Sequence, residues 1–357
     1  MKKLLLLLLA ALIYTNLRAQ HIDCDTRPTG KLIIFSQEQK DKIANAINAP
    51  FTVKIFVTVF ADDDGSHRGA TDENILRQIQ NMANQYQPQN ICFVLGGIRQ
   101  VNNSDLNTHT KDTEAAEVLP FREPGFINIF IHNSLPGLNG TAYGIPNTYL
   151  SLSGGAIASL DNVSTLGHEL GHCLGLYHTF ETVDENGNSN KENVARAGAC
   201  QNCATAGDVI CDTPADDDGG VNAACVYIGG GKDACNVSYA PMTTNMMGYG
   251  SRPCRSIFTN GQGERMRTFL TTDPSLTPLV VQDIIYTPIF GNTTISSGTG
   301  YIFARDAVYV SDGSPNLTVN STAVQFFQAK KVSLKSGTKF SPGTGGKVSV
   351  KSNPYCN

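Results

Sequence analysis

Residues 168–178 read His168-Glu169-Leu170-Gly171-His172-Cys173-Leu174-Gly175-Leu176-Tyr177-His178. In an α-helix, residues i and i+4 lie one above the other, so His168 and His172 present two imidazoles at a spacing that suits zinc. Gly175 permits a sharp turn with positive φ, after which His178 can supply a third ligand. Three protein ligands leave the fourth tetrahedral position open, as a catalytic zinc site requires.

Glu169 sits one residue round the same helix, beside the metal rather than on it. There it can take a proton from zinc-bound water and pass it to a leaving amine, as a general base and then a general acid. The alternative is a surface helix with chance histidines. Three of the seven histidines fall in this short run at the required offsets, with glutamate and glycine in place, and this favours the metal site.

The segments upstream predict a mixed α/β half-domain with a twisted sheet. Dense β-branched and aromatic residues predict core strands, and apolar residues at helical spacing predict a helix capped by Thr71. The expected strands cover residues 51–60, 90–95 and 126–131, with an edge strand in 140–153. The expected helices cover 38–48, 71–86, the histidine segment from Asp161 or Ser164 to Gly175, and 258–270. Residues 179–250 are acidic, cysteine-rich and without periodicity, which predicts a loop-rich lower half.

A second motif, Asn245-Met246-Met247-Gly248-Tyr249, follows the histidines. Together the two motifs resemble the metzincin metalloproteases, in which the extended histidine motif is followed by a methionine-containing turn. The resemblance implies that Met247 forms a hydrophobic floor beneath the zinc. It also implies that Tyr249 stabilises the oxyanion of the tetrahedral intermediate or acts as a hinged zinc ligand.

Three further segments resemble the pappalysin family of metzincins. They are Gly175–Phe180, Gly207–Pro214 and Phe258–Met266, and the resemblance covers roughly residues 51–270. It implies a metzincin-like α/β (α+β) catalytic domain over residues 51–280 and a zinc-dependent endopeptidase that acts on proteins or peptides. One alternative is a metzincin of another family, and another is a catalytically silent binding or adhesion protein with a structural zinc. The presence of both Glu169 and Tyr249 favours the enzyme.

The resemblance also implies a structural calcium and two disulfides. The calcium ligands would be the Asp208 carboxylate, the Cys211 carbonyl and Thr213, since hard oxygen ligands on an irregular loop suit calcium. A solvated acidic loop is the competing interpretation. The implied disulfides are Cys203–Cys235 and Cys225–Cys254.

The N-terminus predicts export. Lys2 and Lys3 precede an apolar run from Leu4 to Tyr14 that is too short to span a bilayer, so we expect a signal peptide over residues 1–19, cleaved near Ala19. An uncleaved anchor is the alternative. All ten cysteines follow this segment and should mostly pair in an oxidising compartment, which argues against a zinc ribbon at Cys200 and Cys203. We expect a secreted or cell-surface protein with no membrane span, and the net charge of −4 gives no reason to expect nucleic-acid binding.

Residues 20–50 form a short leader, and Cys24 within it suggests latency. In several pappalysin zymogens a leader cysteine occupies the open zinc position until the leader is cut away, and a thiolate is a good zinc ligand. Here Asp25 replaces the glycine that usually follows, so a simple disulfide at Cys24 is the alternative. Ser251 and Arg252 replace the acidic residues of relatives specific for basic side chains. We expect that this basic preference is lost, in favour of an acidic residue after the cut bond.

The composition changes near residue 283, where Thr, Ser, Val, Gly and Asn become dominant. Short strands are expected at 307–310, 331–334 and 347–350, so residues 283–357 are predicted to form a small β domain. It resembles stacked β modules appended to secreted bacterial hydrolases. It would serve attachment, binding or secretion, or act only as a stabilising appendage.

Overall fold

The structure is a computed structural model that describes residues 24–28, 32–36, 38–39, 50–110, 115–181, 188, 190–288, 291–311 and 316–356. The expected signal peptide and most of the helix expected over residues 38–48 lie outside these residues. Among the helices in the described ranges, none has the length and apolar character needed to span a bilayer.

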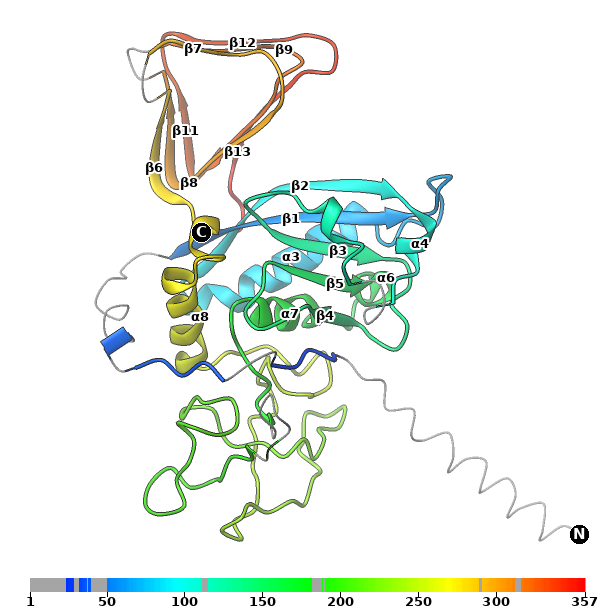
Figure 1. Ribbon diagram of the computed structural model, residues 1–357, viewed down its shortest axis with the longest axis vertical. Helices are drawn as coiled ribbons and strands as arrows, with labels where there is room; N and C mark the ends of the chain where they lie inside the picture. The colour runs from blue at the N-terminus through cyan, green and yellow to red at the C-terminus, as the bar shows by residue number, and fades with distance from the viewer. Residues whose placement is uncertain are drawn as a thin grey trace, which may run out of the picture.

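A five-stranded mixed sheet organises the first half of the chain (Figure 1). Its order is β2 (Ile91–Asn102), β1 (Phe51–Ala61), β3 (Ile127–His132), β5 (Tyr149–Ser153) and β4 (Gly140–Ala142). The first four strands are parallel, and the short edge strand β4 pairs with β5 in the antiparallel sense. The predicted α/β class with a mixed sheet is therefore confirmed, although β2 runs well beyond the expected strand.

Helices α3 (Asp72–Tyr86) and α7 (Thr165–Cys173) cover one face of this sheet, and α8 (Asn260–Thr272) closes the core beside them (Figure 1). Thr71 caps α3 as predicted, since its hydroxyl accepts a hydrogen bond from the Asn74 amide. Thr259 and Gln262 form a capping box at the start of α8. The shorter helices are η1 (Gln87–Gln89), α4 (Ser104–Asn107), η2 (Leu119–Phe121), α6 (Gly154–Ala158) and η3 (Thr277–Leu279).

The described part of residues 179–259 contains no helix or strand and is held by three disulfides, Cys200–Cys235, Cys203–Cys211 and Cys225–Cys254. The predicted Cys225–Cys254 disulfide is present, but the prediction of a Cys203–Cys235 disulfide is wrong. Positive φ angles at Gly207 and Val209 fold the chain back, and Cys203 and Cys211 come within 5.0 Å between Cα atoms. Cys235 is thereby left to bond Cys200.

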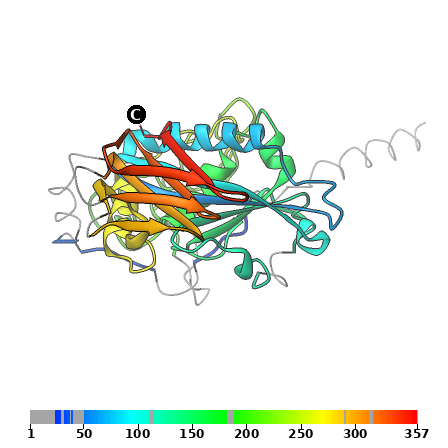
Figure 2. The same cartoon turned by 90° about the horizontal axis from the view of Figure 1, so that it is seen from above.

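The C-terminal strands form a three-sided parallel stack above the other face of the sheet (Figures 1 and 2). The strands are β6 (Gln282–Thr287), β7 (Thr293–Ile295), β8 (Thr299–Val310), β9 (Leu317–Ser321), β10 (Val324–Ala329), β11 (Lys331–Leu334), β12 (Thr338–Pro342) and β13 (Lys347–Ser352). Every pairing among them is parallel, and successive coils lie in register, as in Ile284 with Ala307 and Ala307 with Lys331. This is a β-solenoid of three coils, in which each coil contributes one strand to each side.

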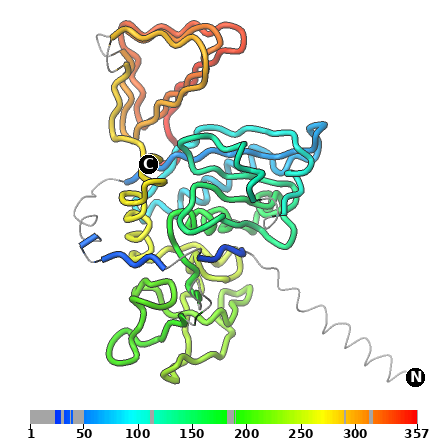
Figure 3. Tube along the Cα trace, in the orientation of Figure 1, coloured from blue at the N-terminus to red at the C-terminus, as the bar shows by residue number. Residues whose placement is uncertain are grey.

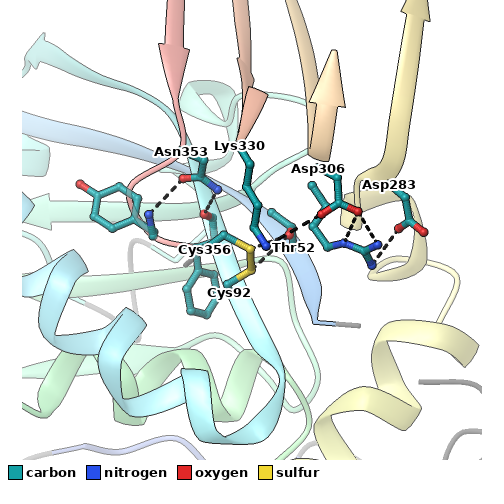
Figure 4. Close-up of a disulfide and its surroundings, with 10 residues drawn as sticks. Thr52, Cys92, Asp283, Asp306, Lys330, Asn353 and Cys356 are labelled. Carbon is teal, nitrogen blue, oxygen red and sulfur yellow. Dashed lines mark hydrogen bonds and ion pairs between the residues drawn. A yellow bond between two sulfur atoms is a disulfide. The ribbon is translucent and has the colours of Figure 1, made fainter. Parts of the chain in front are cut away.

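Three contacts join the solenoid to the five-stranded sheet. Phe56 and Phe126 on the sheet side pack with Phe303 of β8 in one buried cluster. Beyond the last strand, Cys356 forms a disulfide with Cys92 of β2, and the Asn353 side chain donates a 2.8 Å hydrogen bond to the Phe93 carbonyl (Figure 4).

Candidate active site

Helix α7 and the turn after it place the three histidines together. The α7 amide at Thr165 is capped by the Asn162 side chain at 3.2 Å, rather than by the expected Asp161 or Ser164. After α7 ends, Gly175 has φ +94°, and an added Cβ there would lie 2.1 Å from the Phe269 ring. Only glycine fits this turn, which brings His178 back beside the helix.

The three imidazoles form a nearly equilateral triangle of Nε2 atoms. The distances are 3.2 Å for His168–His172, 3.2 Å for His172–His178 and 3.3 Å for His168–His178. Tetrahedral zinc with Zn–N bonds of about 2.05 Å requires nitrogen atoms about 3.3 Å apart. All three side chains are buried, so this donor set fits one zinc ion.

The other ring nitrogens keep the imidazoles in the orientation that metal binding needs. His168 Nδ1 lies 2.7 Å from the Met246 carbonyl and His172 Nδ1 lies 2.8 Å from the Leu176 carbonyl. Donation from Nδ1–H leaves the Nε2 lone pair for the metal. Burial lowers the pKa of His168 well below its usual value and that of His178 to about 3, so the neutral, ligating form dominates.

The buried carboxylate of Glu181 stands 3.8 Å from His178 Nδ1. Sequence reasoning missed this residue, although an acidic side chain three positions after the third histidine was a usable signal. Carboxylates behind ligating histidines orient the ring and raise its basicity.

Glu169 lies under the edge strand β4. An added Cβ at Gly140 would come within 2.7 Å of Glu169 Cγ, so this glycine makes room for the carboxylate. Burial raises the pKa of Glu169 to about 8. A carboxyl group with a pKa near neutrality is suited to both accept and donate a proton.

Met247 and Tyr249 flank the histidines from the turn after residue 245. Met247 is buried, and an added Cβ at Gly171 would lie 2.6 Å from its sulfur, so the thioether packs directly against α7 between His168 and His172. The Tyr249 ring lies 4.9 Å from the His178 ring and 4.4 Å from that of Phe180.

The leader residue Cys24 completes this cluster. Its sulfur lies 3.6 Å from His172 Nε2, and the four candidate ligand atoms all lie within 4.8 Å of one another. With a Zn–S bond of about 2.3 Å, a tetrahedral site places sulfur and nitrogen about 3.6 Å apart. Cys24 forms no disulfide, so the alternative of a simple disulfide there is contradicted. The residue bridges Gly140 of β4, and the Thr26 hydroxyl accepts a 2.9 Å hydrogen bond from the Ala142 amide.

A second polar cluster lies in the loop-rich half. Asp208 and Glu192 are buried, and burial followed by charge repulsion from Glu192 raises the pKa of Asp208 well above its usual value. Thr213 is buried beside them and hydrogen-bonds the Asp208 side chain. Cys211 lies in the same loop, bonded to Cys203. The sequence analysis named three of these residues and missed Glu192, which is far from them in sequence.

Ser251 and Arg252 follow the methionine turn and are half-buried. The Arg252 carbonyl accepts a hydrogen bond from the Ser164 hydroxyl at the start of α7. Arg255, which sequence reasoning did not single out, is fully buried; its Nε donates to the Ser164 hydroxyl at 3.1 Å. Its positive charge adds to the burial that lowers the pKa of His168 and offsets part of the rise that burial gives to the pKa of Glu169.

Comparisons with known proteins find sequence similarity to metalloproteases. The family model described as pregnancy-associated plasma protein-A matches residues 124–271. An extracellular metalloprotease of Colletotrichum graminicola is 27% identical over 66% of this chain and 83% of its own. One of Pyricularia oryzae is 26% identical over 72% and 93%. Among solved structures, mature mirolysin of Tannerella forsythia in complex with a cleaved peptide is 20% identical, with a TM-score of 0.47 over 64% of this chain and 95% of that one.

Proposed function

Because this chain is a pappalysin-family metalloprotease, we propose that it is a secreted, zinc-dependent endopeptidase made as a latent zymogen. The observation that carries the proposal is the buried triangle of His168, His172 and His178 with Glu169 beside it. The relatives are named extracellular, which supports export after loss of residues 1–19.

His168, His172 and His178 would hold the zinc, which when bound polarises the peptide carbonyl and acidifies a water molecule. Glu169 takes the proton of the attacking water and delivers it to the leaving amine. The Tyr249 hydroxyl donates a hydrogen bond to the oxyanion that develops on the substrate carbonyl. Met247 fixes the floor of the site by packing against α7.

Latency would come from Cys24 in the leader segment 20–50. Its sulfur lies 3.6 Å from His172 Nε2 and 3.3 Å from Glu169 Oε2, which supports its role as a fourth zinc ligand. One leader residue thereby excludes the water and engages the general base. Removal of the leader would open both positions.

A structural calcium would bind at Asp208, the Cys211 carbonyl and Thr213, and we add Glu192. Glu192 pairs with Arg196 at 2.8 Å, so Asp208 is the buried carboxylate whose cost a cation would offset, and the oxygen donors of the cluster suit calcium. The Asp208 Oδ2 atom is buried with no hydrogen-bond partner, which supports an ion there.

The residue after the cut bond would be acidic. Ser251 and Arg252 stand in place of the acidic side chains that would attract lysine or arginine, and Arg255 adds a buried guanidinium whose charge favours the ionised form of Glu169. A desolvated guanidinium binds a carboxylate strongly and repels a cation. The solenoid would act in surface attachment or secretion, or only in stability.

Casein zymography tests the enzyme proposal. Processed wild-type protein should clear casein, a zinc chelator should abolish clearing, and added zinc should restore it. Glu169→Ala should be inactive while retaining zinc by metal analysis. Activity that survives in Glu169→Ala would refute the mechanism, and inactivity of processed wild type would favour a binding protein.

A further inference from the structure

A second piece of the leader, residues 32–36, lies on the catalytic domain apart from Cys24 (Figure 3). It rests on a surface that we call the leader groove, formed by Tyr177, Arg265 and Phe269. Tyr177 belongs to the turn after Gly175, and the other two belong to α8. None of them is a candidate zinc ligand.

The leader backbone is hydrogen-bonded on both sides within the groove. The Ile33 amide donates to the Tyr177 hydroxyl at 3.0 Å, and Arg265 donates to the Ile33 carbonyl at 2.8 Å. Both hydrogen bonds are made to the peptide main chain, as in other modes of peptide recognition. They fix the path of the leader without specifying its side chains.

Leader side chains add two apolar anchors. The Phe35 ring meets the Phe269 ring edge-on at 4.8 Å, and the Arg265 guanidinium lies 5.6 Å from the Phe35 ring. Leu32 packs against the cluster of Ile145, Tyr177 and Val209. Ile34, between the anchors, is 52% exposed and supplies a matched control.

The groove walls are built independently of the leader. Arg265 donates from Nε to the Gly175 carbonyl at 2.7 Å, a contact outside the leader. Its guanidinium also lies 4.7 Å from the Tyr177 ring and 5.2 Å from the Phe269 ring. A cation held between two aromatic faces and a carbonyl forms a preorganised surface, which loses little entropy on binding.

The groove extends beyond the leader segment. A cavity of about 480 Å³ lies beside Phe35, between residues 209–212 and α8. The ligand class that the groove fits is a short peptide that carries an aliphatic and an aromatic residue three positions apart.

We propose that the leader groove is a peptide-binding site separate from the zinc site, and that it holds the leader through Leu32 and Phe35 independently of the Cys24 thiol. The inference deepens the proposed zymogen and rests on that function.

The test uses amide hydrogen exchange on the full chain with Glu169→Gln, which prevents self-cleavage. In this background, Cys24→Ser should speed exchange of residues 24–28 while exchange at residues 32–36 changes less than about twofold. Phe35→Ala or Leu32→Ala should speed exchange at residues 32–36, including the Ile33 amide, by about tenfold or more. Ile34→Ala should behave as the parent, because its side chain faces solvent.

Two results would overturn the proposal. One is equal acceleration by Phe35→Ala, Leu32→Ala and Ile34→Ala, and the other is loss of protection at residues 32–36 when only Cys24 is replaced. The melting temperature of each variant shows that the catalytic domain remains folded. Exchange does not depend on catalysis, so failure of the proposed protease activity would be seen separately, in the zymogram of the wild type.

Discussion

The Tyr249 hydroxyl donates a hydrogen bond to the carbonyl oxygen of Cys24. The Tyr249 hydroxyl, which we assign to the oxyanion, is thus hydrogen-bonded to the leader. Its partner, Cys24, is also the residue whose sulfur lies beside the histidines. Cys24 and Thr26 therefore contact each part of the candidate site. The Cys24 sulfur lies beside His172 Nε2 and Glu169, and the Thr26 hydroxyl donates to Glu169.

Replacement of Cys24 by serine should activate the full-length protein. A serine hydroxyl is a far weaker zinc ligand than a thiolate, so water can reach the open position. We expect at least a tenfold rise in casein hydrolysis before any processing. The same change in a Glu169→Ala background should give no activity, and an unchanged rate in Cys24→Ser would contradict the switch.

Tyr249→Phe should lower kcat of the processed enzyme by about 10²-fold and leave KM nearly unchanged, since the hydroxyl acts on charge that develops only in the transition state. The phenylalanine ring keeps the contacts with His178 and Phe180. Steady-state kinetics on a fluorogenic peptide measure this split. A rise in KM alone would assign Tyr249 to substrate binding.

Arg255→Met should weaken the preference for an acidic residue after the cut bond by about tenfold, because the buried positive charge is lost. Arg255→Lys should retain part of that preference. Cleavage mapping on a proteome-derived peptide library measures both variants and the wild type. If lysine or arginine predominates after the cut bond in the wild type, the assignment of an acidic preference is wrong.

Calcium removal should destabilise the protein more at pH 8 than at pH 5. Burial raises the pKa of Glu192 from 4.5 to about 7. Without a cation, the folded state therefore holds more protons than the unfolded state between these values, and stability falls as pH rises through this window. Calcium should offset the loss at pH 8. Thermal melts with and without a calcium chelator test this, and Glu192→Gln should reduce the difference between the two pH values.

Removal of the Cys92–Cys356 disulfide should lower the free energy of unfolding by about 2–5 kcal/mol, because the bond restricts the unfolded chain. The double change to alanine avoids a lone thiol. Denaturant titration measures the loss. An unchanged midpoint would show that the Phe56, Phe126 and Phe303 contacts suffice to hold the solenoid.

The parts of the fold and site that sequence predicted are those encoded locally. Helical spacing placed His168 and His172 on one face of α7, and Gly175 predicted the turn that leads to His178. Thr71 predicted the cap of α3 for the same reason, since its hydroxyl bonds an amide three residues away. Such features depend on a few neighbouring residues and on backbone geometry.

The features that sequence missed depend on long-range packing. Cys203 bonds Cys211 because Gly207 and Val209 between them adopt positive φ, and no local sequence pattern predicts this at Val209. Glu192 meets Asp208, and Arg255 meets Ser164, only when the loops fold over α7. The parallel coils of the solenoid were equally hidden, because their weakly alternating strands are in register only across a whole coil.

The bond between Cys92 and Cys356 has a further consequence for a protein that works among proteases, itself included. It turns residues 92–356 into a covalent ring that contains the three candidate histidine ligands, Glu169 and Tyr249. A single cut anywhere within that ring opens it without releasing a fragment. An enzyme nicked once therefore keeps all its catalytic parts on one molecule, whereas a cut in the leader, which lies outside the ring, frees the leader.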